Sequence, residues 1–152
     1  MSSTMQFSGV ELFSVPPAKL FAVVTDLDAL AATIPDITSA ERVDERTLRC
    51  VVRPGFSFLR GTLHTTIEIA ELQPPESALM RIASQGIGAT VKIESRLSIS
   101  PTDDGGSRLD WTAAVTELKG LVATISRPLI QAAAEKTISK AWHDLRLKVE
   151  KP

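Results

Sequence analysis

Between residues 37 and 116 the chain alternates polar and apolar positions with a period of two, which predicts strands. The alternation is clearest in residues 47–53, 62–70 and 90–100, and it continues in residues 78–85 and 108–116. Strands with one polar and one apolar face are typical of an antiparallel sheet that is covered on one side. The segment Asp103-Asp104-Gly105-Gly106 predicts a hairpin turn between the last two strands.

The first 35 residues predict one strand and two short helices. Residues 5–14 have strand character, and we expect Gly9 to mark a bulge there. Pro16-Pro17 then begins a short helix that runs to about Thr25. Asp26 predicts an N-cap for a second helix over residues 27–33, which must end before Pro35.

The end of the chain predicts a long amphipathic helix, residues 128–149, which Pro128 separates from the apolar residues before it. Apolar positions recur at steps of three and four and form one stripe: Ile130, Ala134, Ile138, Ala141, Leu145 and Val149. Outside the stripe lie Glu135, Lys136, Lys140, His143 and Arg146. We expect the helix to lie on the dry face of the sheet with its stripe inward.

The predicted fold is therefore α+β: a curved antiparallel sheet of six to seven strands, two short helices after strand 1 and a long C-terminal helix. A sheet closed by one helix tends to leave an apolar cavity between the two. We expect this cavity to bind an apolar or amphipathic small molecule or lipid without chemistry. The residues predicted to face it are Leu48, Cys50, Val52, Met80, Ile82, Ile93, Leu97, Trp111, Ala113, Ile130, Ala134 and Ile138. The sequence leaves open whether Trp111 is a cavity wall or a core plug.

Composition narrows the class of protein. At 152 residues the chain is the size of one domain, and we assign residues 1–152 to it. The formal net charge of −1 gives no basic field for nucleic acid, so no nucleic-acid partner is expected. One cysteine, and a start without an apolar signal segment, favour a cytoplasmic protein. No run of about 18 apolar residues predicts a membrane span.

Few residues suggest chemistry. His64 and His143 both fall on predicted polar faces, and Cys50 is the single cysteine and shares its strand face with the apolar Leu48 and Val52, so neither a metal site nor a catalytic triad is predicted. We expect no cofactor and no enzymatic activity. Asp26 is explained as a helix cap, and Gly86 and Gly88 are explained by a kink or a close approach of two backbones.

The segment between Pro54 and Gly61 carries large apolar side chains where polar turn residues are usual. This segment has two interpretations: Phe56, Phe58 and Leu59 pack over the core, or they form a loop at the cavity mouth or on a membrane surface. Arg53 and Arg60 would favour the membrane contact if the surface is anionic.

Several short motifs resemble the carbon monoxide dehydrogenase G-subunit family (CoxG) of the START/SRPBCC superfamily. They are the opening segment Val15-Pro16-Pro17-Ala18-Lys19-Leu20-Phe21, Thr25-Asp26, Leu30-Ala31, Ile34-Pro35, the glycines Gly61, Gly86 and Gly88, and Lys119-Gly120-Leu121-Val122-Ala123. The chain departs from the family pattern at Asp36, where glycine is usual, and it ends at Pro152, where many members continue into a membrane-anchoring segment.

The resemblance implies the helix-grip fold and an apolar ligand cavity. It also implies an alternative function, an accessory protein that recruits or matures a molybdenum-containing hydroxylase, or acts at a membrane surface. A second alternative is a cyclase or hydrolase that uses the same cavity, which would require an acid or base pointing inward.

Overall fold

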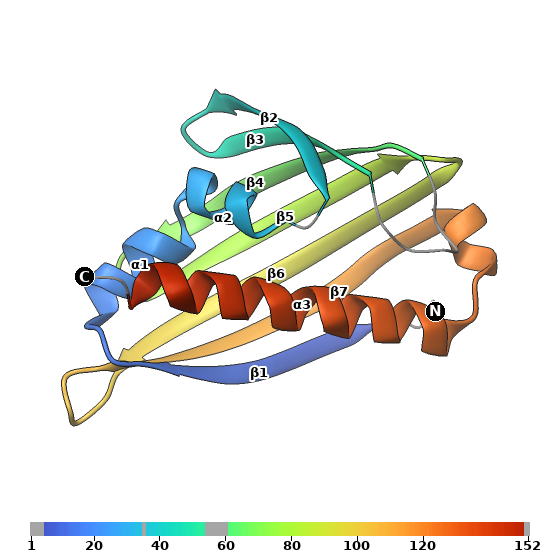
Figure 1. Cartoon of the computed structure of the whole chain (residues 1–152). Helices are drawn as coiled ribbons and strands as arrows, with labels where there is room; N and C mark the ends of the chain where they lie inside the picture. The colour runs from blue at the N-terminus through green and yellow to red at the C-terminus, as the bar shows by residue number, and fades with distance from the viewer. Residues whose placement is uncertain (1–4, 35, 54–60, 151–152) are drawn as a thin grey trace.

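A computed structural model describes residues 5–34, 36–53 and 61–150 of the chain (Figure 1). Seven strands in this part of the chain form one antiparallel sheet in the order β1-β7-β6-β5-β4-β3-β2. The strands are β1 (Gln6–Phe13), β2 (Ile37–Asp44), β3 (Thr47–Val52), β4 (Leu63–Gln73), β5 (Ser77–Gly86), β6 (Ala89–Pro101) and β7 (Ser107–Gly120). The predicted curved sheet is confirmed.

Two short helices follow β1, as predicted. Helix α1 (Pro17–Val24) begins with proline in its first turn. Helix α2 (Leu27–Thr33) is capped by Asp26, whose Oδ1 accepts a hydrogen bond of 3.0 Å from the backbone N–H of Asp28. After β7 comes one 3₁₀ turn, η1 (Leu121–Thr124), and then α3 (Arg127–Val149). Helix α3 crosses the concave side of the sheet and contacts α1 and α2 (Figure 1).

The prediction of a bulge at Gly9 is wrong. Strand β1 pairs with β7 without a register shift, and Gly9 lies opposite Trp111. A Cβ built on Gly9 would lie 2.8 Å from Cζ2 of the Trp111 indole. Glycine is needed there because the indole rests on the β1 backbone, and the sequence pattern could not reveal this contact between distant segments.

Two strands continue beyond their predicted ends. Strand β4 reaches Gln73 through an irregularity after Ala70, where Glu71 has a φ of 48°. Strand β7 reaches Gly120, and its pairing with β6 shifts register between Lys92 and Ile93. Such shifts interrupt the alternation of side chains, and the period of two therefore fails as a signal at these points.

Candidate functional site

The inner face of the sheet, which is turned toward α3, is filled at one end. The pairing register places Ala78, Leu97 and Trp111 in one cross-strand row, with Ile99 and Leu109 in the next, and all five are buried. Buried residues of α1 and α2 and the last turns of α3 complete this core: Leu20, Phe21, Val24, Leu27, Leu30, Leu145 and Val149.

Three aromatic side chains mark the limit of the filled end. The ring centroids of Trp111 and Trp142 are 6.0 Å apart, and those of Phe13 and Trp142 are 6.4 Å apart. Trp111 is 9 % exposed and belongs to the core cluster, and its buried Nε1 has no hydrogen-bond partner among the described residues. At this end of the sheet Trp111 therefore acts as a core plug, which was one of the two roles that the sequence left open.

Arg146 ties α3 to β1 beside these rings. It lies outside the apolar stripe, as predicted, but its side chain is only 34 % exposed. The guanidinium carbon lies 4.4 Å from the ring centroid of Phe13, and Nη2 lies 3.0 Å from Oε1 of Glu11. This contact anchors the C-terminal end of the helix.

The other half of the inner face is more open. Met80, Ile82, Ile93, Ala113 and Val115 occupy inward positions in adjacent strands, yet all are only half-buried. The first half of α3 behaves in the same way, since Ile130, Ala134 and Ile138 are half-buried whereas Leu145 and Val149 are buried. Inward apolar side chains on both elements are therefore only partly covered.

Hydroxyl groups lie on the inner face of this half. Oγ1 of Thr65 on β4 and Oγ of Ser84 on β5 are 2.8 Å apart, and Cys50 pairs with Thr65 across β3 and β4. Thr65 is buried, and the Cys50 side chain is 3 % exposed, so burial raises the pKa of its thiol. The sequence analysis selected Cys50 as a site residue but neither Thr65 nor Ser84. Both hydroxyl residues occupy inward positions in the alternation of their strands, and that alternation could have identified them.

The twelve residues predicted to face the cavity thus divide into three groups. Leu97 and Trp111 belong to the filled end, and Leu48 and Cys50 are buried on β3. The remaining eight are half-buried: Val52, Ile93, Ile130 and Ala134, and also Met80, Ile82, Ala113 and Ile138, which pack against the core cluster. Phe56, Phe58 and Leu59, predicted as a cavity-mouth or membrane loop, lie outside the described residues.

Glycines near the β5–β6 turn allow neighbouring backbones to approach closely. A Cβ on Gly86 would lie 2.1 Å from the carbonyl oxygen of Thr62, and one on Gly120 would lie 1.9 Å from that of Gly88. Gly61 contacts the side chain of Ile87, which has a φ of 57° between the two turn glycines. The close approach predicted for Gly86 is therefore confirmed, whereas the φ of 68° at Gly88 is the observation that favours glycine there.

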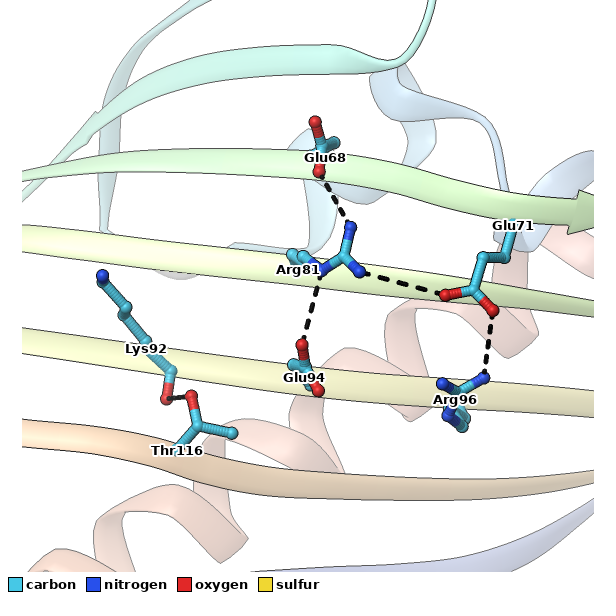
Figure 2. Close-up of polar contacts among 7 residues, drawn as sticks. All are labelled: Glu68, Glu71, Arg81, Lys92, Glu94, Arg96 and Thr116. Atoms are coloured by element: carbon cyan, nitrogen blue, oxygen red, sulfur yellow. Dashed lines mark hydrogen bonds and ion pairs between the residues drawn. The ribbon is translucent and has the colours of Figure 1, made fainter.

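The outer face of the sheet is charged. Figure 2 shows Arg81 between Glu68 and Glu94, both 3.4 Å away, with Glu71 at 3.9 Å. The hydrogen bonds that Arg81 donates to Glu94 and Glu68 raise its pKa. Beside this network lies a hollow of about 630 Å³, lined from β2 to β6 by Ser39, Ala40, Glu41, Arg49, Cys50, Val51, His64, Thr65, Thr66, Ala83, Gln85, Thr90 and Lys92.

Other candidate residues are placed as surface groups. His64 and His143 are exposed, as predicted, and His64 lines the outer hollow. Asp26 and Asp28 lie 3.8 and 3.7 Å from Nη2 of Arg42. In the described part of the chain no three His, Cys, Asp or Glu side chains are grouped as metal ligands would be. None of its helices combines the length and apolar character that crossing a bilayer requires.

The arrangement of sheet and helices is that of START-like helix-grip proteins. A conserved protein from Geobacillus kaustophilus is similar with a TM-score of 0.86 and 19 % identity, covering 95 % of both chains. A START superfamily protein from Mycobacterium smegmatis has a TM-score of 0.70 and 18 % identity, covering 95 % of this chain and 97 % of its own. The protein Ara h 8.0201 has a TM-score of 0.68 and 19 % identity, covering 97 % and 98 %.

Within this class the sequence identifies one family. Residues 9–150 match CoxG, the family of the carbon monoxide dehydrogenase G subunit, and the chain therefore belongs to it. The comparison with curated proteins gave no match.

Proposed function

We propose that this protein binds an apolar or amphipathic small molecule between the open half of the sheet and the first half of α3, without transforming it. The observation that carries the proposal is the gradient of burial along the inner face. Inward side chains such as Leu97 and Leu109 are buried at one end, whereas Ile82, Ile93 and Ala113 are half-buried at the other. Apolar surface that keeps contact with water gains free energy when an apolar ligand covers it.

The chemistry of the open half favours a ligand with an apolar body and a small polar group. Its inward side chains are mainly aliphatic, and the hydroxyls of Thr65 and Ser84 are available as hydrogen-bond partners. Because burial holds the Cys50 thiol in its neutral form, it adds no charge to this region. A neutral hydrogen-bonding group on the ligand would fit these partners.

Titration with the fluorophore Nile red, compared between two tryptophan variants, tests the proposal. Ala113 and Ala114 are neighbours on β7, but Ala113 pairs with Ser95 on the inner face and Ala114 with Glu94 on the outer face. We expect Ala113→Trp to weaken binding at least about tenfold, because the new ring occupies the ligand's space, and Ala114→Trp to change it less than about twofold. Cooperative unfolding by circular dichroism controls for folding. A folded wild-type protein that binds no probe would refute the proposal.

A second candidate function is an accessory role for a molybdenum-containing hydroxylase. The family match over residues 9–150 supports it, because the family is named for a component of carbon monoxide dehydrogenase. Purified protein should then co-migrate in size-exclusion chromatography with a molybdenum hydroxylase from the same organism. Separate elution at micromolar concentrations of both proteins, well above the Kd of a stable complex, would count against this role.

A cyclase or hydrolase that uses the same cavity is a third candidate. It would require an acid or base aimed at the ligand. The polar side chains on the open inner face of the described residues include the hydroxyls of Thr65, Ser84 and Ser95 and the buried thiol of Cys50. Turnover of a bound ligand that is lost in Thr65→Val and retained in Ile82→Val would support an enzyme.

A further inference from the structure

The hollow lies mainly on the outer face of the sheet, because most of its lining residues occupy outward strand positions, although the inward residues Ala40, Cys50 and Thr65 also line it. Its floor is made by short side chains, and longer ones stand on either side. The pairing register aligns one cross-strand row over five strands: Glu41, Arg49, Thr66, Ala83 and Lys92. Thr66 and Ala83 in the middle of this row leave the space that the hollow occupies.

Two cations face each other across this floor. Arg49 on β3 and Lys92 on β6 are separated by three strand spacings, or about 14 Å between backbones. Both side chains are long and flexible enough to extend over Thr66 and Ala83 toward a common point. Polar groups surround that point, since His64, Gln85 and Thr90 line the same hollow.

Arg49 differs from the other arginines of this face. Arg81, Arg96 and Arg108 each form ion pairs with carboxylates on neighbouring positions, at 3.1 to 3.9 Å. Within the described part of the chain Arg49 has no ion-pair partner, although Glu41 is its direct cross-strand neighbour. Lys92 lies 3.8 Å from Glu117, which also pairs with Lys119 at 3.3 Å. The hollow is therefore lined by Arg49 without an ion-pair partner among the described residues, by Lys92, which shares Glu117 with Lys119, and by one carboxylate, Glu41.

We propose that this hollow is a second binding site, which takes a small molecule through an anionic oxygen group, either a phosphate or a carboxylate. Arg49 and Lys92 supply the opposite charge, and Thr66, Thr90 and Gln85 supply neutral hydrogen-bond donors. The guanidinium of Arg49 can bind two oxygens of the group at once. Glu41 lies at the rim, and its carboxylate repels an anion. Replacing Glu41 by glutamine should therefore strengthen anion binding.

The test is a titration of the backbone amide resonances with inorganic phosphate and, separately, with acetate, at ionic strength held constant with chloride. We expect saturable shifts at Thr66, Ala83 and Thr90 with at least one anion, and the anion that saturates identifies the class. Arg49→Gln and Lys92→Gln should each raise the Kd about tenfold or more, because each removes a charge-assisted contact. Glu41→Gln should lower the Kd at least twofold.

Lys136→Gln is the matched control, because it removes the same charge from an exposed position of α3. It should leave the Kd within about twofold of the wild-type value, and the amide spectrum of each variant shows whether it is folded. Linear shifts with both anions, or equal weakening by Lys136→Gln and Arg49→Gln, would overturn the proposal. Nile red binding by Arg49→Gln should be unchanged, so a failure of this site is distinguishable from a failure of the apolar one.

Discussion

At the scale of single residues, the packing of one indole depends on the absence of one side chain. Trp111 is buried against Gly9, and the aromatic group that it forms with Phe13 and Trp142 divides the filled from the open half of the inner face. A side chain at position 9 would displace the Trp111 indole and so change where the filled half of the inner face ends. The glycine therefore influences the packing of the inner face through its contact with the indole.

We predict that Gly9→Ala lowers the free energy of unfolding by about 1–3 kcal/mol, because the new methyl group overlaps the Trp111 ring. In a Trp111→Phe background the same change should cost less than about 0.5 kcal/mol, since the smaller ring leaves room. Urea unfolding of the four proteins in this double-mutant cycle measures the coupling. Equal costs in both backgrounds would show that the contact with the indole is not the reason for glycine.

Cys50 reports the register of β3. Its side chain is 3 % exposed, whereas that of its neighbour Arg49 is exposed on the opposite face. We predict that a thiol reagent labels native Cys50 at least about a hundredfold more slowly than the denatured chain, and that Arg49→Cys in a Cys50→Ala background is labelled rapidly. Fast native labelling of Cys50 would mean that the strand is shifted by one residue.

The same burial makes stability depend on pH. Because burial raises the pKa of Cys50, the unfolded chain loses the thiol proton at a lower pH than the folded chain does. Stability should therefore be unaffected below the ordinary thiol pKa and should fall as the pH rises above it. Cys50→Ala should remove that part of the decline, as measured by urea unfolding at several alkaline pH values.

Asp36 has a backbone conformation that is uncommon for residues other than glycine. Its φ of 62° lies in the left-handed region, which glycine adopts most readily. Aspartate is among the residues that tolerate this conformation best. Its carbonyl oxygen accepts a hydrogen bond of 3.0 Å from the backbone of Arg53, so the turn keeps its connection to the end of β3.

At the scale of elements, α3 makes two kinds of contact along its length. Its C-terminal half is held by the burial of Leu145 and Val149 and by Arg146, which bonds to β1. Its N-terminal half presents Ile130, Ala134 and Ile138 half-buried toward the sheet. The helix is therefore anchored at one end and covers the open half of the sheet with the other.

We predict that Ile138→Asp lowers the free energy of unfolding by about 2–4 kcal/mol, because it places a charge on the stripe packed against the core. His143→Ala, on the exposed side of the same helix, should change it by less than about 1 kcal/mol. Denaturant unfolding measures both. A large loss from the histidine change, or tolerance of the aspartate, would contradict the assignment of the stripe.

At the scale of the whole molecule, the burial of inward side chains differs between the two ends of the sheet. The buried rows around Leu97 and Leu109 form a continuous core with α1, α2 and the end of α3. The open half has partly buried side chains and a turn in which Gly86, Ile87 and Gly88 all have positive φ. Regions with fewer buried contacts open more easily than the core.

Native-state hydrogen exchange should show this division. We predict that the amides of Leu97 and Leu109 exchange only through global unfolding, whereas those of Ser84 and Val91 exchange through smaller openings, at least about tenfold faster. Bound Nile red should slow exchange selectively at Ser84 and Val91. Uniform protection along β5 and β6 without ligand would contradict the proposed division of the inner face.

The sequence alone determined the elements and their faces. Proline and Asp26 delimit α1 and α2, alternation identifies the strand cores, and the stripe of α3 is visible from its spacing, because these signals arise from residues close together in the chain. The extension of β7 and the role of Gly9 were decided by the tertiary structure, because each depends on the strand beside it. The same holds for the open inner half of the sheet and for the outer hollow. Strand pairing places Thr65 beside Ser84 on the inner face, and it places Arg49 and Lys92 in one row on the outer face. These residues are distant in sequence, and local periodicity carries no information about which strands become neighbours.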